Sequence, residues 1–360
     1  MERYCYLTGV DERRAQRLLY ESEGLEGFFT NLGARMYDLA TDAVNDLFFG
    51  FTKGVRYDRS GGKSKPRAAF FCSMNLSRLS IKPFAIYGIC GADAPTDGSV
   101  YFQAYACRQE ELFGPEFFRQ VFGTRYISEE AVRSLKPVDG THPIPDFNVP
   151  VTDFVPVIEE ADRSVICDIV EQLYSKRIVV IRLESGCDFN KRSSRLLAGI
   201  YSLIPPVHRI ETGFATYKSP AEILKIVNDT SVRLFIVPHE ESVLDLLQQG
   251  FSLFDLESDY STGTESGLYD LLNRWSYVDF PEREETARYF EQKLLLEGHG
   301  DAELFPILIE KYFDPAQWWW DREESKGTIK DLQTLADRHK NTPLLNNISS
   351  VNKRFKEKFE

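Results

Sequence analysis

The sequence lacks the features that mark export, membrane insertion or a zinc site. It has no run of about 18 uninterrupted apolar residues, which argues against a membrane-spanning helix. Its first residues, MERYCYLTGVDERR, show no basic region followed by an apolar core, so we expect no secretory signal. The six cysteines are scattered, with no C-x-x-C pair and no zinc spacing. Because several of them, such as Cys72 and Cys90, lie in apolar runs, we expect reduced, buried thiols in a cytoplasmic protein.

Positive charge is also in short supply. The chain has 43 Lys and Arg residues against 55 Asp and Glu residues, a net charge of −12. Such a balance argues against broad binding to nucleic acid or to anionic membranes, both of which favour basic surfaces. Apolar residues make up 42% of the chain, which is enough for a folded core. At 360 residues the chain exceeds the roughly 300 at which single cores stop growing, so we expect more than one domain.

Residues 1–136 are expected to form an α+β domain. Five short segments rich in Phe, Tyr, Val and Ile, bounded by Gly, Asp and Ser, predict mostly antiparallel strands: RYCYLTGV, FFGFTKGVRYD, PRAAFFCSM, KPFAIYGIC and GSVYFQAYAC. Apolar residues at helical spacing predict a helix over 28–47, and further helices are expected in EELFGPEFFRQVFG and ISEEAVRSLK. The arrangement is similar to that of longin-like domains.

The segment 137–157 holds a cluster of prolines and is expected to be an extended linker. Residues 158–240 then alternate between helix and strand, with RIVVIRLE and VRLFIVP typical of strands buried on both faces. Ser219, Pro220 and Glu222 match an N-cap, a first-turn proline and a capping-box acid. This order predicts a small parallel α/β domain built from β-α-β crossovers.

Residues 241–360 are expected to form a helical C-terminal region with apolar stripes. Within it, Glu282, Glu284 and Glu285 are most simply solvated side chains. Trp318, Trp319 and Trp320 are expected to pack in the core or at a domain interface, with an exposed patch for a partner as the alternative.

The stretch SGGKSKP, residues 60–66, resembles the end of a phosphate-binding P-loop but has neither its spacing nor a following helix. It lies in the one concentrated basic region of the sequence, which is expected to be a hairpin tip. In an acidic chain, such a loop is a candidate contact surface for an acidic partner, where charge mainly speeds and orients association. The residues assigned to it are Arg56, Arg59, Lys63 and Lys65.

A second candidate surface is the strand-to-helix connection at residues 185–194, which includes Lys191 and Arg192. Ligands often bind at such loops in parallel sheets, so the alternative to a protein contact is a nucleotide- or phosphate-binding enzyme that uses Cys187–Ser194. Cys187 would act as a nucleophile only if His208 or His239 folds close to it. The loop has no G-x-G-x-x-G pattern, and the five histidines are far apart, so we assign no cofactor, metal or catalytic residue.

The segment LLAGIYSLIPPVHRIETGFATY, residues 196–217, resembles the middle part of the bacterial GTPase-associated protein family found in conflict systems. The likeness is carried by a Leu-Pro-Pro pattern, a basic residue and a Phe-x-Thr-Tyr strand, at Leu203, Pro205, Pro206, Arg209, Phe214, Thr216 and Tyr217. Ile204 stands between the leucine and the prolines. The segment GADAPTDGSVYFQAYACRQEEL is similar to the N-terminal part of the same family, through Asp93, Gly98, Tyr101 and Phe102.

The order of elements is also similar, more distantly, to that of DENN modules, which engage small GTPases. These resemblances imply a non-catalytic, cytoplasmic adaptor or regulator. The implied partner is a GTPase or another component of a prokaryotic defence-type assembly, with no nucleic-acid or membrane partner. The sequence leaves the oligomeric state open.

Overall fold

The structure of the protein is a computed structural model. It describes residues 4–10, 16–21, 68–74, 84–92, 100–112, 114–126, 153–184, 188–258, 260–262 and 268–296, and isolated positions between 326 and 356. The helices predicted over 28–47 and in ISEEAVRSLK, the FFGFTKGVRYD strand and the three consecutive tryptophans lie outside the described residues.

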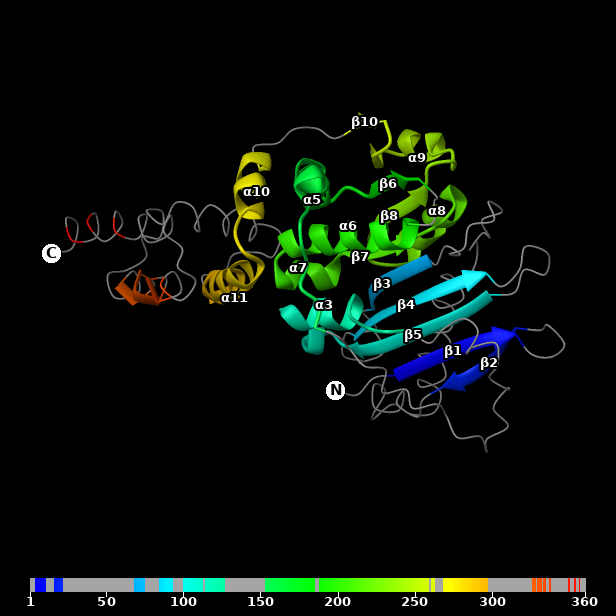
Figure 1. The fold of residues 1–360 in the computed structure, drawn as a ribbon, viewed down its shortest axis with the longest axis horizontal. Helices are drawn as coiled ribbons and strands as arrows, with labels where there is room; N and C mark the ends of the chain where they lie inside the picture. Colours follow the sequence, from blue (N-terminus) through cyan, green and yellow to red (C-terminus); the bar gives the residue numbers. More distant parts are fainter. Residues whose placement is uncertain are drawn as a thin grey trace.

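The described strands form one ten-stranded sheet in the order β10-β9-β6-β8-β7-β3-β4-β5-β1-β2. Figure 1 shows this sheet running from β2 at one end to β10 at the other. The strands are β1 Tyr4–Val10, β2 Gln16–Glu21, β3 Ala68–Met74, β4 Phe84–Ala92, β5 Val100–Arg108, β6 Val179–Leu183, β7 Gly213–Thr216, β8 Val232–Pro238, β9 Ser252–Asp255 and β10 Tyr260–Ser261. The protein therefore has a mixed α/β fold.

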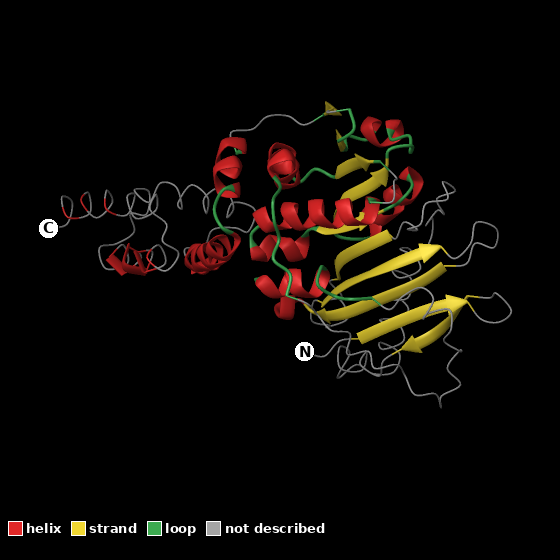
Figure 2. Cartoon of the chain, in the orientation of Figure 1, coloured by secondary structure: helices red, strands yellow, loops and turns green. Residues whose placement is uncertain are grey.

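The described helices lie mainly along the parallel half of the sheet, as Figure 2 shows. None of the described helices is long and apolar enough to cross a membrane. The α-helices are α3 Pro115–Val121, α5 Arg163–Tyr174, α6 Phe189–Leu203, α7 Pro206–Glu211, α8 Pro220–Asp229, α9 Leu244–Gln248, α10 Tyr269–Ser276 and α11 Phe280–Leu296, and the 3-10 turns are η2 Gln109–Leu112 and η3 Glu160–Asp162.

The parallel half confirms the predicted β-α-β crossovers. Strand β6 pairs in parallel with β8 on one side and with β9 on the other, and β8 pairs in parallel with β7. Strands β6 and β8 are almost wholly buried, as their continuous apolar runs predict. The capping box that begins α8 is also present, because the backbone N–H of Ser219 donates to the carboxylate of Glu222 at 3.2 Å.

The antiparallel half consists of β3, β4, β5, β1 and β2, each antiparallel to its neighbour. It joins the parallel half through β3 and β7, which pair antiparallel with Phe71 opposite Phe214. Gly213 permits this close approach, because a Cβ there would lie 2.8 Å from the backbone oxygen of Phe71. The segments predicted as an α+β unit and a parallel unit thus share one sheet.

Four elements, α7, β9, β10 and β2, differ from the sequence expectation. The prolines after α6 do end that helix, but Pro206 also occupies the first turn of α7, a position that suits proline. The short strands β9 and β10 lie in the segment assigned to a helical region; β9 extends the parallel sheet beside β6. The strand β2, antiparallel to β1, was not predicted.

An aromatic cluster fills the space between α3, α6 and the β3-β7 junction. The ring of Phe117 stacks on Tyr201 with centroids 5.1 Å apart and meets Phe71 edge to face at 5.1 Å. Phe122 stacks on Phe214 at 6.0 Å. Because these rings come from both halves of the chain, one core holds the two halves together.

A buried ion pair holds α11 against α7. The guanidinium of Arg209, on α7, forms a two-pronged pair with the Glu284 carboxylate on α11, with Nη1 to Oε2 at 2.9 Å. Both side chains are 2% exposed. Glu282 is buried as well, so the expectation that Glu282 and Glu284 are solvated is wrong. Residues 282–284, 286 and 287 are all buried, so the start of α11 is covered by protein on most sides.

Candidate functional site

The carboxyl ends of the parallel strands contain the point where the crossover connections diverge. The chain moves from β6 to β7 in one direction along the sheet and returns from β7 to β8 in the other. Right-handed crossovers therefore place α6 and α8 on opposite faces. The loops that follow β6 and β8 separate at this edge, which is where open parallel sheets usually bind ligands.

Three side chains link the ends of the parallel strands at this edge. Arg182, on β6, donates from Nη1 to Oδ2 of Asp255, the last residue of β9, at 2.9 Å. Its Nη2 donates to the backbone oxygen of His239, which follows β8. The Nδ1 atom of His239 lies 3.3 Å from Oδ1 of Asp255. The cluster ties β6, β8 and β9 together.

Asp255 is held in its ionised form. Burial alone would raise its pKa, but the backbone N–H of Glu257, the Arg182 guanidinium, Ser258 and His239 together lower the pKa of this carboxyl below its usual value. Since the folded pKa is below the unfolded one, this carboxylate stabilises the fold above the unfolded pKa of about 3.9 and loses that effect as the pH falls through the folded value. The ionised Asp255 carboxylate therefore anchors the Arg182 guanidinium at the end of β6.

The first turns of α6 present three cations to solvent. Lys191, Arg192 and Arg195 are all exposed and lie on one side of the helix. Arg192 Nη1 lies 2.8 Å from Oε1 of Glu257, and Arg195 pairs with Glu159. Lys191 makes no ion pair with any described residue. The two residues that the sequence assigns to a contact surface, Lys191 and Arg192, are therefore exposed, and Arg192 is already paired.

Of the other single residues considered in the sequence as part of a site, only the two histidines are among the described residues. Arg56, Arg59, Lys63, Lys65 and Cys187 lie outside the described residues. His239 is at the carboxyl edge, beside the end of β6, because its backbone N–H donates to the Leu183 oxygen at 2.7 Å. His208 is on α7, near the amino ends of the strands. Of the two histidines considered as bases for Cys187, only His239 is at the edge from which the loop to α6 leaves.

The described cysteines support the expectation of buried thiols. Cys72, Cys90, Cys107 and Cys167 are all free and buried. Burial raises the pKa of Cys90 and of Cys167 to about 11, so both remain protonated at neutral pH. A protonated thiol is a poor nucleophile and a poor metal ligand, so these residues act as small apolar groups in the core.

Sequence reasoning missed Arg182 and Asp255 as members of this edge. The signal was weak because Asp255 ends a strand of only four residues, Ser252–Asp255, which follows the short helix α9. Within the described residues, no group of three His, Cys, Asp or Glu side chains could hold a metal ion. At the carboxyl edge, Arg182, His239 and Asp255 instead contact one another.

No family model matches the chain, and a search of curated proteins finds no match either.

Proposed function

We propose that this chain is a non-catalytic adaptor or regulator that binds a GTPase, or another component of a prokaryotic defence-type assembly, through the exposed face of α6. The observation that carries the proposal is the row of solvent-exposed cations Lys191, Arg192 and Arg195 at the carboxyl edge of the parallel strands. The basic segment at Arg56, Arg59, Lys63 and Lys65 is the proposed second part of the contact surface.

Arg192 and Arg195 form exposed ion pairs, whose acidic members a binding partner could replace. The Arg192 and Glu257 side chains are 44% and 31% exposed, and Arg195 and Glu159 are 52% and 42% exposed. Exposed pairs of this kind contribute only about 0–1 kcal/mol to stability. Acidic groups on a partner can therefore replace Glu257 and Glu159 at little cost, while the positive charge orients the approach.

Exposed apolar side chains lie in the segment just before α5. This segment leads to Glu159, which pairs with Arg195 of α6. In the extended segment at 153–158, the side chains of Val155 and Val157 are 63% and 69% exposed, and Phe154, Pro156 and Ile158 alternate with them on the inner side. Apolar residues beside charged ones are typical of protein contact surfaces. This favours a protein partner over a small anionic ligand for the α6 face.

The residues that carry the family resemblance are themselves in the core. Leu203, Pro205, Pro206, Arg209, Phe214, Thr216 and Tyr217 are all buried. They define a crossover and its packing, so a partner cannot contact them directly. A shared partner class would instead depend on exposed positions that this crossover holds in place, and α6 is the helix that leads into it.

The test is a double charge reversal, Lys191→Glu with Arg192→Glu, assayed by pull-down and by calorimetry with the GTPase encoded nearest to the gene for this chain. We expect binding to fall by about tenfold or more, because two attractive contacts become repulsive. Lys225→Glu with Lys330→Glu makes the same change of charge at exposed positions elsewhere and is expected to leave binding unchanged. Equal binding by both double variants and the unmodified chain would refute the proposed surface.

The alternative is a nucleotide- or phosphate-binding enzyme that uses Cys187–Ser194. One observation favours it: the 15-residue helix α6 has no acidic residue in its first turn, and Asp188 at its N-cap makes no capping bond. The backbone amides at a helix N-terminus suit an anion. This alternative predicts a rise in the melting temperature with nucleotides or phosphate that Lys191→Glu abolishes. A flat response across a nucleotide screen would eliminate it.

A further inference from the structure

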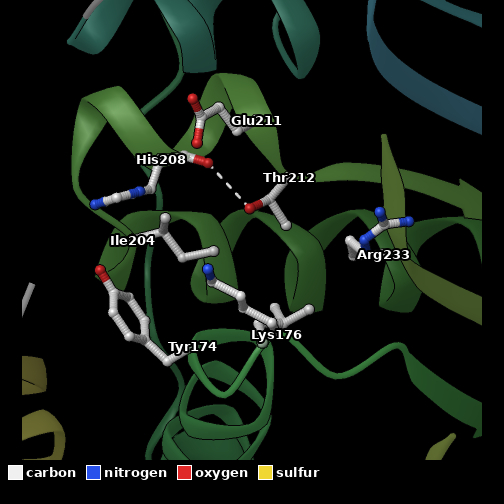
Figure 3. A pocket seen from close by; sticks show the side chains of 8 residues that line it. Tyr174, Lys176, Ile204, His208, Glu211, Thr212 and Arg233 are labelled. Carbon is white, nitrogen blue, oxygen red and sulfur yellow. Dashed lines mark hydrogen bonds between the residues drawn. The ribbon is translucent and has the colours of Figure 1, made fainter. Parts of the chain in front are cut away.

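A hollow of about 390 Å³ opens at the opposite edge of the sheet, among the amino ends of the parallel strands. It is formed where α5 ends, where α7 ends and where β8 begins. Figure 3 shows Lys176 extending from beyond the end of α5 toward α7, with His208 and Tyr174 on one side and Arg233 on the other. Ile204 supplies part of an apolar wall.

Two cations in this hollow have no carboxylate partner among the described residues. Lys176 makes no ion pair there. Arg233 donates from Nη1 only to the backbone oxygen of Val232, at 3.2 Å. By contrast, Arg182, Arg192 and Arg209 each pair with a carboxylate. Lys176 and Arg233 instead share an open space.

The backbone at Lys176 is unfavourable for lysine. Its φ is 56°, in the left-handed region that favours glycine. The turn is a Schellman motif, because the N–H of Lys176 bonds to the Leu173 oxygen at 3.0 Å and the N–H of Arg177 to the Gln172 oxygen at 3.1 Å. These bonds already satisfy the last carbonyls of α5, and glycine would form them with less strain. Helix capping therefore does not explain the lysine side chain.

We propose that this hollow binds a small molecule through an oxyanion, a phosphate or carboxylate group, held between Lys176 and Arg233. Its volume is in the range of small-molecule sites, about 300–1,000 Å³. A guanidinium and an ammonium are the usual partners of such anions. Glu211 also lines the hollow and lowers its net positive charge, which favours a ligand with one anionic group. Leu173, Tyr174 and Ile204 would contact a flat or apolar body.

This site is independent of the proposed partner surface on α6, since it lies at the other ends of the strands. Its test is calorimetry with three ligands that share a phenyl ring: phenyl phosphate, benzoate and the uncharged benzamide. We expect saturable binding of at least one anion and none of benzamide. Comparison of the two anions distinguishes a phosphate site from a carboxylate site. Equal binding of benzamide, or no saturable binding of either anion, would overturn the proposal.

Two substitutions link the binding to the residues. Lys176→Gly and Arg233→Gln are each expected to weaken anion binding by about tenfold, because each removes a charge-assisted hydrogen bond. Lys225→Ala, at an exposed position on α8, is the matched control and should bind as the unmodified chain does. Anion binding that survives both pocket substitutions, or that Lys225→Ala weakens equally, contradicts the assignment.

Lys176→Gly also separates loss of the ligand from loss of the fold. Glycine relieves the left-handed backbone, so we expect the melting temperature without ligand to rise, by about 1–3 °C. A variant that is more stable and binds the anion less tightly shows that the side chain serves the ligand at the cost of stability. If the more stable variant binds the anion with unchanged affinity, the Lys176 side chain does not contribute to ligand binding.

Discussion

Replacing Glu284 with alanine is expected to lower the free energy of unfolding by about 3–5 kcal/mol. The carboxylate is 2% exposed and binds the Arg209 guanidinium on both of its oxygens. Without this carboxylate, Arg209 remains a buried charge. Its Nε donates to the backbone oxygen of Tyr201 at 2.7 Å, and its Cζ lies 4.7 Å from the centre of the Phe118 ring. Neither supplies a negative charge.

The loss is expected to extend to the docking of α11, because a second arginine depends on the same region. Arg283 donates from Nη1 to the Val278 oxygen at 2.7 Å and from Nη2 to Ser202 Oγ at 3.1 Å. Burial lowers the pKa of Arg283 to about 10, although the neighbouring Glu284 acts to raise it. Removing Glu284 leaves two buried cations without its charge, so α11 and the end of α10 should loosen together.

Urea unfolding followed by circular dichroism, with near-ultraviolet signals for the buried Trp275, measures this effect. Glu257→Ala is the matched control, because it breaks an exposed pair, with Arg192, and should cost under about 1 kcal/mol. The double variant Arg209→Met with Glu284→Leu should recover much of the loss, because it leaves no unpaired charge. A Glu284→Ala loss no larger than that of Glu257→Ala would show that the buried pair is not needed.

The buried pair also shows where prediction from sequence ends. Local signals were strong where one segment decides its own structure: Ser219 and Glu222 lie three positions apart and predicted the start of α8, and the apolar run 179–183 predicted a buried strand. Arg209 and Glu284 are 75 positions apart. No local pattern relates them, so three glutamates near the start of α11 were interpreted as a solvated face.

The candidate sites were missed for related reasons. The Lys176 turn ends α5 without the glycine that usually marks such a turn, so its left-handed backbone left no trace in the sequence. Asp255 and Arg182 belong to strands whose pairing is set by the crossover order, which short apolar runs do not specify. By contrast, Lys191 and Arg192 were found because they directly follow a predicted strand, where a parallel sheet places its loops.

The second large effect is expected at the junction of the two halves of the sheet, where Phe71→Ala should lower the free energy of unfolding by about 3–5 kcal/mol. The Phe71 side chain is fully buried, and its ring lies 5.1 Å from Phe117, 6.4 Å from Tyr201 and 6.2 Å from Phe214. These partners come from α3, α6 and β7. The substitution would leave a cavity that rigid strands on either side cannot close.

Phe71→Leu separates cavity formation from the loss of aromatic contacts. Leucine fills most of the volume, so we expect it to retain much of the stability and to lose mainly the edge-to-face contacts, worth about 0.5–1.5 kcal/mol each. Val155→Ala, at an exposed position, should change the unfolding midpoint little. The decisive measurement is whether probes in both halves of the chain unfold together. If Phe71→Ala lowers the midpoint of both, the halves share one cooperative core across the β3-β7 junction; a shift confined to the antiparallel half would show that they unfold separately despite the shared sheet.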